Sequence, residues 1–294
     1  MDSVNRRDFM RQAACAVAAA TALPPALATA ADTAAPVKAA VARRTLGSSG
    51  LSCTRLGLGT GTRAWNKDSA QIRAGRDTFL NTLTRAYEQG IRYFDVSDSY
   101  GSHQYLRDAM AASGMKREDM FILTKSQSKT ADAIRADLDR MRKEVDTDYF
   151  DVVLLHCMTA GDWPQQMAGC MDVLSEAQQK GIIKAKGVSC HHLQALEAAA
   201  DSDWVDILLG RINPYGTHMD GTREEITGVL GRARTNGKGV IGMKILGEGK
   251  HAGEKEACIR FAMEQECLDA FVIGFLNPAE VDDIVSLMDK TTVG

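Results

Sequence analysis

The chain has 294 residues, of which 25% are charged, and a formal net charge of −3. Acidic and basic residues are interspersed, so no basic face indicates nucleic-acid binding and no acidic tail is present. Once an N-terminal targeting segment is set aside, the length suits one catalytic domain with a large core, and the composition indicates a protein that acts on a small molecule.

The first thirty residues have the features of an export signal. Arg6 and Arg7 lie within Asn5–Arg11 and precede an alanine-rich, weakly apolar stretch over residues 12–31. This pattern resembles a twin-arginine signal, with small-residue cleavage sites at 26–28 and 28–30. We therefore predict a signal peptide over residues 1–30, transport by the twin-arginine export machinery, and a periplasmic or otherwise exported mature protein.

The alternatives for this segment are a disordered arm and a membrane anchor. An anchor needs roughly 20 apolar residues in one helix. Alanine and threonine supply little transfer energy, and Pro24 and Pro25 interrupt such a helix. We therefore expect no stable membrane insertion of the mature protein.

The cysteines give no disulfide framework. Cys15 would leave with the signal peptide. The others have no CxxC spacing and are too sparse for a disulfide scaffold, although an exported location permits pairing, so pairing stays open. They are Cys53, Cys157, Cys170, Cys190, Cys258 and Cys267.

After an alanine-rich linker predicted over residues 31–42, the folded domain is expected to span residues 43–294. Short apolar runs there alternate with longer amphipathic ones, the pattern of repeated strand–helix units and a parallel sheet. The strand candidates are Arg55–Gly59, Ile91–Val96, Met120–Thr124, Phe150–Leu155, Ile182–Val188, Val205–Leu209, Gly239–Met243 and Ala270–Ile273. The helix candidates include Thr78–Gln89, Thr130–Val145, Gln165–Lys180, His192–Ala200, Arg223–Asn236 and Gly253–Glu266.

These eight strands fit a closed (β/α)8 TIM barrel, an α/β fold. A doubly wound open sheet is the structural alternative. That fold usually carries a GxGxxG turn between its first strand and first helix, and Gly57–Gly61 does not supply this spacing. The barrel is therefore the prediction.

Four polar residues follow three successive strands. Asp95 and Tyr100 follow the second strand, Lys125 ends the third, and His156 ends the fourth. Barrel enzymes place reactive groups at these strand ends. Each residue alone is weak evidence for a site, because a strand-end Asp often caps a helix and a lone Lys is usually solvated. Their joint appearance at successive strand ends predicts a catalytic site.

The chemistry of carbonyl reduction by hydride transfer gives these residues distinct roles. The developing alkoxide needs a proton, and a phenol with a pKa near ~10 is a poor donor unless its surroundings tune it. The Lys125 ammonium would increase the acidity of Tyr100, and Asp95 would keep Lys125 charged and positioned. His156 would hydrogen-bond the substrate oxygen and orient it.

These positions match the Asp-Tyr-Lys-His tetrad of the aldo-keto reductase superfamily, which the chain resembles from Arg44 to Asp283. Arg44–Leu51 resembles the β-hairpin that closes the floor of the family's barrel. The resemblance implies an NAD(P)(H)-dependent oxidoreductase that interconverts a carbonyl (aldehyde or ketone) and an alcohol, with Tyr100 as acid/base. Its partner would be a small-molecule carbonyl or alcohol substrate.

The resemblance also implies cofactor-binding residues, some of which depart from the family pattern. Ser189 and Cys190 would hold the nicotinamide carboxamide, with Cys190 in place of Asn. Arg211 stands where Gln is usual beneath the nicotinamide, and Met243 replaces an aromatic residue that stacks on the ring. The other expected contacts are Gly59 and Thr60 in the first strand, Lys244, Leu246 and Gly247 along the pyrophosphate, and Gly274, Phe275, Glu280 and Asp283 around the adenosine.

The sequence does not settle which nicotinamide cofactor is used. The Lys or Arg that often binds the 2′-phosphate is missing after the eighth strand, where Phe275 and Leu276 stand. A phosphate normally calls for a cation or oriented amides. Family habit alone favours NADP(H) over NAD(H). Twin-arginine export carries folded proteins, so the signal and a cytoplasmic cofactor support each other.

Two alternative functions stay open. Histidines and cysteines at His156–Cys157 and Cys190–His192 are possible metal ligands, but their spacing is not that of a closed zinc motif and no metal is expected. The second alternative is an exported cofactor-binding or sensor protein on the same barrel without turnover, against which the intact tetrad argues. Trp65 and Trp163 either line the substrate mouth or only pack their loops.

Overall fold

The computed structural model describes residues 38–291. The twin-arginine segment and most of the predicted linker lie outside these described residues. Among the helices of residues 38–291, none is long and apolar enough to cross a membrane.

The core of the fold is a closed barrel of eight parallel strands, which confirms the predicted (β/α)8 architecture. Around the barrel the strand order is β10-β3-β4-β5-β6-β7-β8-β9. The strands are β3 (Leu56–Gly59), β4 (Tyr93–Asp95), β5 (Phe121–Ser126), β6 (Phe150–Met158), β7 (Ile183–Cys190), β8 (Ile207–Arg211), β9 (Gly239–Met243) and β10 (Ala270–Gly274). Each strand follows the one before it in sequence, and β10 closes the ring on β3.

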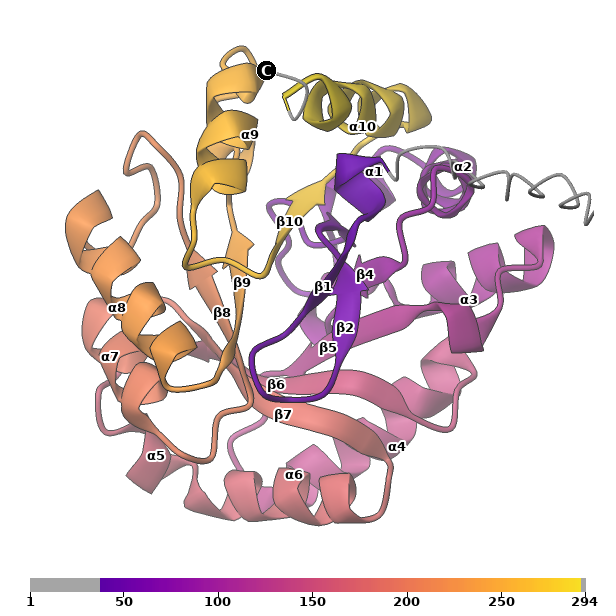
Figure 1. Cartoon of the computed structure of the whole chain (residues 1–294). Coiled ribbons are helices and arrows are strands. Elements are labelled where there is room, and N and C mark those ends of the chain that lie inside the picture. Colours follow the sequence, from indigo (N-terminus) through magenta and orange to yellow (C-terminus); the bar gives the residue numbers. More distant parts are fainter. Residues whose placement is uncertain (1–37, 292–294) are drawn as a thin grey trace, which may run out of the picture. The chain divides into compact units, whose positions relative to one another are not determined.

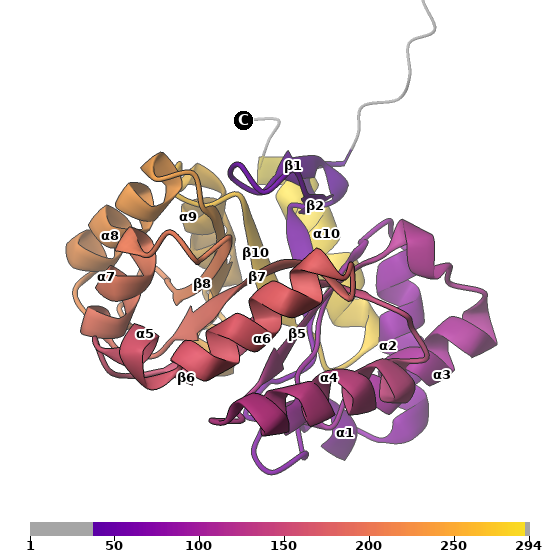
Figure 2. The same cartoon turned by 90° about the horizontal axis from the view of Figure 1, so that it is seen from below.

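Helices surround the strands (Figures 1 and 2). They are α1 (Ala70–Arg73), α2 (Arg76–Glu88), α3 (His103–Ser113), α4 (Ala131–Val145), α5 (Trp163–Gln166), α6 (Ala168–Gln179), α7 (Leu193–Asp201), α8 (Arg223–Thr235), α9 (Lys255–Glu264) and α10 (Pro278–Thr291). Short 3-10 turns occur at η1 (Ala39–Val41), η2 (Asp98–Tyr100), η3 (Arg117–Asp119) and η4 (Gly247–Gly249). The single helix predicted over Gln165–Lys180 is divided into α5 and α6, with Met167 between them.

A β-hairpin closes the N-terminal end of the barrel. Its strands are β1 (Arg43–Thr45) and β2 (Ser52–Thr54), paired antiparallel. The hydroxyl of Thr54 accepts hydrogen bonds from the backbone N–H groups of Arg92 and Tyr93, where β4 begins. The hairpin therefore lies at the ends of the strands opposite to those that carry the tetrad, as the family resemblance implied.

The apolar core has two parts because successive strand residues point to opposite faces of the sheet. One part fills the barrel interior and the other lies between strands and helices. An added Cβ at Gly187 would lie 1.8 Å from the carbonyl oxygen of Ile207, so β7 and β8 require a residue without a side chain there. Toward the C-terminal strand ends, the buried residues become polar and include Asp95, Lys125 and Ser189.

The packed chain begins before Arg43. Ala39–Val41, which the sequence analysis assigned to the linker, forms η1, and Ala40 is buried in the core. The backbone N–H of Ala39 donates to Asp289 Oδ1 of α10 at 2.8 Å. Apolar contact and this hydrogen bond thus fix residues that look linker-like in composition.

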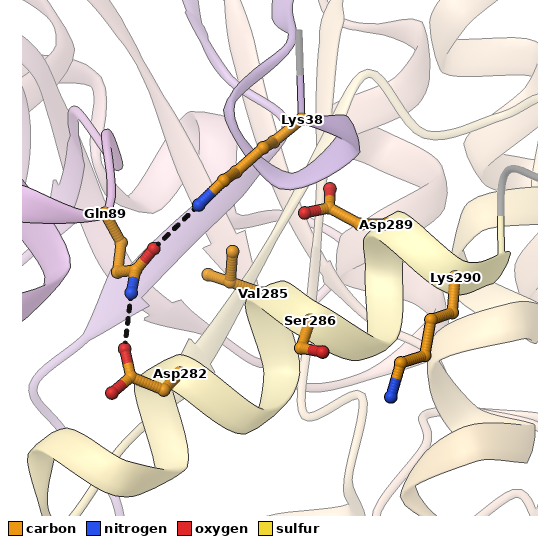
Figure 3. Close-up of a pocket in the computed structure, with 7 residues that line it drawn as sticks. All are labelled: Lys38, Gln89, Asp282, Val285, Ser286, Asp289 and Lys290. Carbon is orange, nitrogen blue, oxygen red and sulfur yellow. Dashed lines mark hydrogen bonds between the residues drawn. The ribbon is translucent and has the colours of Figure 1, made fainter. Parts of the chain in front are cut away.

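A hollow of about 810 Å³ lies beside this turn, where it meets the end of α2 and the outer face of α10 (Figure 3). Lys38 donates to Gln89 at 3.0 Å, and Gln89 donates in turn to Asp282 at 2.5 Å. The hollow is lined by these residues together with Val285, Ser286, Asp289 and Lys290. None of the predicted site residues lines it.

Candidate active site

Asp95 and Lys125 form a buried ion pair at the C-terminal ends of two neighbouring strands. β4 and β5 are adjacent, and the Lys125 ammonium contacts Asp95 Oδ1 and donates to the carbonyl oxygen of Val96 at 3.4 Å. Asp95 is 3% exposed and Lys125 is 1% exposed. Burial raises the pKa of Asp95 and lowers the pKa of Lys125, and their mutual attraction opposes both shifts.

Tyr100 lies in η2, the turn that follows β4. Its ring packs on Gly61, where an added Cβ would lie 2.4 Å from ring atoms. The Lys125 ammonium is 4.9 Å from the centre of the ring, and the His156 ring meets it edge-on with centroids 5.6 Å apart. The structure therefore brings all four tetrad residues together, from three neighbouring strands.

The surroundings of Tyr100 differ from the expectation that Lys125 would make the phenol more acidic. Burial raises the pKa of Tyr100 well above its ordinary value, and the negative charge of Asp95 adds to the effect. The ammonium lies over the face of the ring, and no hydrogen bond joins it to the hydroxyl. Because Asp95 neutralises Lys125, burial decides the direction of the shift, and the hydroxyl holds its proton.

His156 is the fourth member of this cluster. The residue is 6% exposed, and its Nδ1 lies 3.2 Å from the hydroxyl of Ser97 and 3.4 Å from that of Ser99. Burial, followed by the nearby charge of Lys125, lowers the pKa of His156 well below its ordinary value. The imidazole is therefore neutral. Neither serine was predicted from the sequence, although their alternation between Asp95 and Tyr100 was a usable signal.

A cavity of about 460 Å³ extends from this cluster to the ends of α9 and α10. This volume is typical of small-molecule sites. Ten predicted site residues line it: Gly59, Asp95, Tyr100, Met243, Lys244, Leu246, Gly274, Phe275, Glu280 and Asp283. Two members of the cluster, Asp95 and Tyr100, thus share one space with most of the expected cofactor-binding residues.

Other residues of the wall were not predicted. They are Gly61, Thr62, Arg63, Ala70, Leu209, Ile245, Glu248, Gly249, Ala252, Lys255, Val272, Ile273, Leu276 and Ile284. One of them, Thr62, packs against the backbone at Gly274, where an added Cβ would lie 2.0 Å from Thr62 Oγ1. The Gln71 amide donates a hydrogen bond to that same oxygen at 2.8 Å. Such packing joins segments that no local sequence pattern connects.

Three cations line the cavity, two of them near acidic partners. Lys244 Nζ is 2.5 Å from Glu248 Oε1, and Lys255 contacts Asp283. Arg63 donates to the carbonyl oxygen of Glu248 at 3.3 Å. Lys255, paired with Asp283, brings a cation to the end of the cavity where none was predicted from the sequence, because it comes from α9 and not from the segment after β10.

Glu280 is held at the start of α10. Its carboxylate accepts hydrogen bonds from the backbone N–H of Leu276 at 2.8 Å and from the Asn277 amide at 3.1 Å. Asn277 accepts in return from the backbone N–H of Glu280 at 3.0 Å. These reciprocal caps fix the first turn of the helix at the cavity wall.

The structure places other predicted cofactor-binding residues outside this cavity. Thr60 is fully buried, and its hydroxyl is bonded to the carbonyl oxygen of Asp95 and to Ser102, so it braces the β4 end. Ser189 accepts a hydrogen bond from the backbone N–H of Cys157 at 2.9 Å. Gly247 begins η4 with a φ of 55°, a backbone role.

Cys190 turns away from the barrel mouth. Its thiol is buried and lies 3.4 Å from the carbonyl oxygen of Ala195 in α7. Strand alternation explains the correction: Ser189 faces inward, so Cys190 faces the helices. The next residue, His191, lies beside His156 with ring centroids 6.4 Å apart. Burial, followed by the charge of Arg211, lowers the pKa of His191 to about 3.

Arg211 forms an ion pair with a residue that was not predicted from the sequence. Its guanidinium makes a two-pronged contact with the carboxylate of Asp220, with one prong at 2.9 Å. The Asp220 side chain is almost fully buried. The pair therefore fixes the loop after β8 and neutralises a cation that the resemblance placed beneath the nicotinamide.

The structure also locates the possible metal ligands and the two tryptophans, Trp65 and Trp163. Within residues 38–291, no three His, Cys, Asp or Glu side chains are grouped as metal ligands, and the six cysteines there are free thiols. Trp163 is buried against Trp204 and donates to the carbonyl oxygen of Ala195 at 3.2 Å, so it packs its loop. Trp65 is 81% exposed.

Comparison with known proteins agrees with this geometry. The Aldo/keto reductase family matches residues 55–257, more than half of the chain. Methylglyoxal reductase DkgB of Salmonella typhi is 27% identical over 149 residues, which cover 49% of this chain and 55% of the relative. An aldo-keto reductase of Mycobacterium avium is 29% identical over 119 residues, which cover 37% of this chain and 38% of the relative. The chain thus spans about half the length, or less, of these curated relatives.

Solved structures share the fold. A Pseudomonas aeruginosa protein described as a candidate aldo-keto reductase superimposes with a TM-score of 0.72 at 21% identity, over 87% of this chain and 97% of that one. An aldo-keto reductase from Bacillus halodurans, solved in its holo form, gives a TM-score of 0.67 at 15% identity, over 83% and 90% of the two chains. The closed barrel, the tetrad at its strand ends and the family match lead to one conclusion: this chain belongs to the aldo/keto reductase family.

Proposed function

We propose that this protein is an NAD(P)(H)-dependent oxidoreductase that interconverts a small aldehyde or ketone and the corresponding alcohol, with Tyr100 as acid/base. The observation that carries the proposal is the convergence of Tyr100 on the buried Asp95–Lys125 pair and on a neutral His156. Asp95 and Tyr100 of this cluster line a cavity whose wall also carries three cations and the carboxylates of Glu248, Glu280 and Asp283.

The cations of the cavity wall support a nicotinamide dinucleotide. Arg63, Lys244 and Lys255 suit a pyrophosphate and a further phosphate. When bound, such a cofactor supplies or accepts the hydride.

The residues of the tetrad would handle the proton and orient the substrate. Tyr100 keeps its proton because of burial and can donate it to a carbonyl oxygen placed within hydrogen-bond reach of its hydroxyl. A neutral His156 can hydrogen-bond that oxygen without competing as a stronger acid. The Lys125 ammonium, held by Asp95, offers positive charge near the phenol when a proton leaves it.

The substrate class is drawn from the relatives. Several of them are named methylglyoxal reductases, and the cavity of about 460 Å³ that Tyr100 lines has room for a small reactive carbonyl. We therefore propose methylglyoxal and similar aldehydes as first substrates to test. The absence of turnover with cofactor bound would instead support a binding or sensor protein.

Replacing Tyr100 with Phe tests the function directly. With NADPH or NADH and either methylglyoxal or 4-nitrobenzaldehyde, kcat should fall by about 10²–10⁴-fold, the range expected when a general acid is lost. Loss of cofactor absorbance measures the rate. Cofactor affinity should stay close to that of the wild type. The matched control, Tyr105→Phe on α3, should keep full activity, and an active Tyr100→Phe variant would contradict the assignment.

The raised pKa of Tyr100 predicts different pH dependences for carbonyl reduction and alcohol oxidation. Reduction needs the protonated phenol, so its single-turnover rate should be constant between about pH 6 and 9. Oxidation of the alcohol needs the phenolate, so its rate should rise about tenfold per pH unit over the same interval. Stopped-flow measurement of both directions decides this. A reduction rate that halves between pH 7 and 8 would rule out a raised pKa.

We propose NADP(H) as the preferred cofactor, with Lys255 as its phosphate-binding cation. Lys255→Gln should weaken NADPH binding about tenfold, the usual cost of one charge-assisted hydrogen bond, and change NADH binding less than twofold. Titration of tyrosine and tryptophan fluorescence gives both affinities. Lys250→Gln, an exposed site five residues earlier, is the control. Equal weakening of both cofactors would assign Lys255 to the common part of the dinucleotide.

Export by the twin-arginine route is also proposed, on the basis of Arg6, Arg7 and the alanine-rich stretch that follows. Cell fractionation should find the mature protein in the periplasm. Changing both arginines to lysine should keep the protein in the cytoplasm. A mature protein that stays cytoplasmic with both arginines present would refute the proposed location.

A further inference from the structure

Arg140 on α4 lies outside the cavity, yet its guanidinium contacts three carboxylates. Nη1 is 2.8 Å from Asp98 Oδ1 and 2.8 Å from Glu144 Oε1, and Nη2 is 2.7 Å from Asp137 Oδ1. Asp137 and Glu144 are on the same helix, whereas Asp98 belongs to η2. The side chain of Arg140 is only 35% exposed, so solvent screens these contacts incompletely.

The first carboxylate holds the turn that carries Tyr100. Asp98 is the first residue of η2, and Tyr100 is the last. Lys67 also approaches Asp98, at 3.3 Å, but its side chain is 55% exposed. Arg140 is therefore the better-shielded cation on this turn, and it anchors the turn to a long helix.

The second carboxylate, that of Glu144, is linked through His103 to the segments that carry Tyr100 and Lys125. Glu144 Oε2 lies 2.9 Å from His103 Nδ1, and His103 Nε2 lies 2.8 Å from Thr124 Oγ1. His103 is buried and follows Tyr100 by three residues, and Thr124 immediately precedes Lys125. The contact with His103, followed by that with Arg140, lowers the pKa of Glu144 to about 2, so it is ionised at neutral pH.

The third carboxylate holds the chain just after Lys125. Asp137 Oδ2 accepts hydrogen bonds from the hydroxyl of Ser126 and, at 2.7 Å, from that of Ser128. Ser126 is the last residue of β5, and Ser128 lies in the loop that leads to α4. Contacts that start at one guanidinium therefore reach the chain on both sides of Tyr100 and on both sides of Lys125.

We propose that Arg140 is a positioning residue that fixes the distance between the Tyr100 turn and the Lys125 strand end. The inference rests on the proposed reductase function for its kinetic consequence, but its structural part does not. The planar guanidinium suits this role because it donates hydrogen bonds to Asp137 and Glu144 while its charge also faces Asp98. Without it, the carboxylates of Asp98, Asp137 and Glu144 would lose the cation that they share at the base of the turn.

The test compares Arg140→Gln with Arg135→Gln, a control on the same helix whose arginine is 54% exposed and contacts Asp132 and Glu176. We expect kcat to fall roughly 10–100-fold in Arg140→Gln, because a displacement near 1 Å costs about that much. KM and cofactor affinity should change less than twofold, and Arg140→Lys should recover only part of kcat. Arg135→Gln should match the wild type.

Hydrogen exchange provides a measurement that does not depend on turnover. In Arg140→Gln, backbone amides of residues 97–104 and 124–128 should exchange faster together, while the rest of the barrel keeps the wild-type rate. If Arg140→Gln does not fold, Asp98→Asn takes its place and should loosen residues 97–104 alone, with a similar loss of kcat.

The outcomes separate the two proposals. A wild-type protein that reduces no carbonyl would defeat the proposed function, and the hydrogen-exchange result would still decide the role of Arg140. Unchanged kcat in Arg140→Gln, or faster exchange spread evenly over the barrel, would overturn the positioning role and leave Arg140 a general stabiliser.

Discussion

The site depends on one buried ion pair, that between Asp95 and Lys125. Two charges removed from water are stable only if each has a close, well-oriented partner. The barrel meets this condition because β4 and β5 are adjacent and parallel, which brings both side chains to the same end of the sheet. Loss of either partner would leave an uncompensated charge above the apolar interior.

The pair also sets the properties of its neighbours. The positive charge of Lys125 contributes to the neutral state of His156, and the negative charge of Asp95 helps to keep the proton on Tyr100. Burial is the larger cause in both cases. One compact group of four side chains therefore contains a protonated phenol, a neutral hydrogen-bonding ring and a fixed ion pair, a combination that suits the carbonyl chemistry proposed for this site.

Two shells of different chemistry surround this group. Toward α9 and α10 lies the long cavity, with glycines and three cations on its wall. On the other side, polar contacts from α4 hold the segments that carry Tyr100 and Lys125. Apolar packing alone would leave η2 weakly fixed, since it is a short turn with few buried side chains. Polar contacts to a rigid helix supply the missing restraint.

The sequence by itself determined the barrel and the tetrad. Alternating apolar and amphipathic runs encode strands and helices locally, and consecutive parallel strands place Asp95, Lys125 and His156 at one end. The approximate positions of the strands were predicted well because the pattern of apolar residues that defines a strand is local. The splitting of α5 from α6 and the packing of η1 on α10 could not be predicted, because these depend on distant contacts.

Only the tertiary structure decided how the rest of the site is built. Cys190 faces α7 and His191 takes the position near the site, since side-chain direction at a strand end follows from the register of the whole sheet. Lys255 reaches the adenosine end of the predicted cofactor site from another helix, and Asp220 neutralises Arg211. Such contacts join residues through space, and the order of residues along the chain does not encode them.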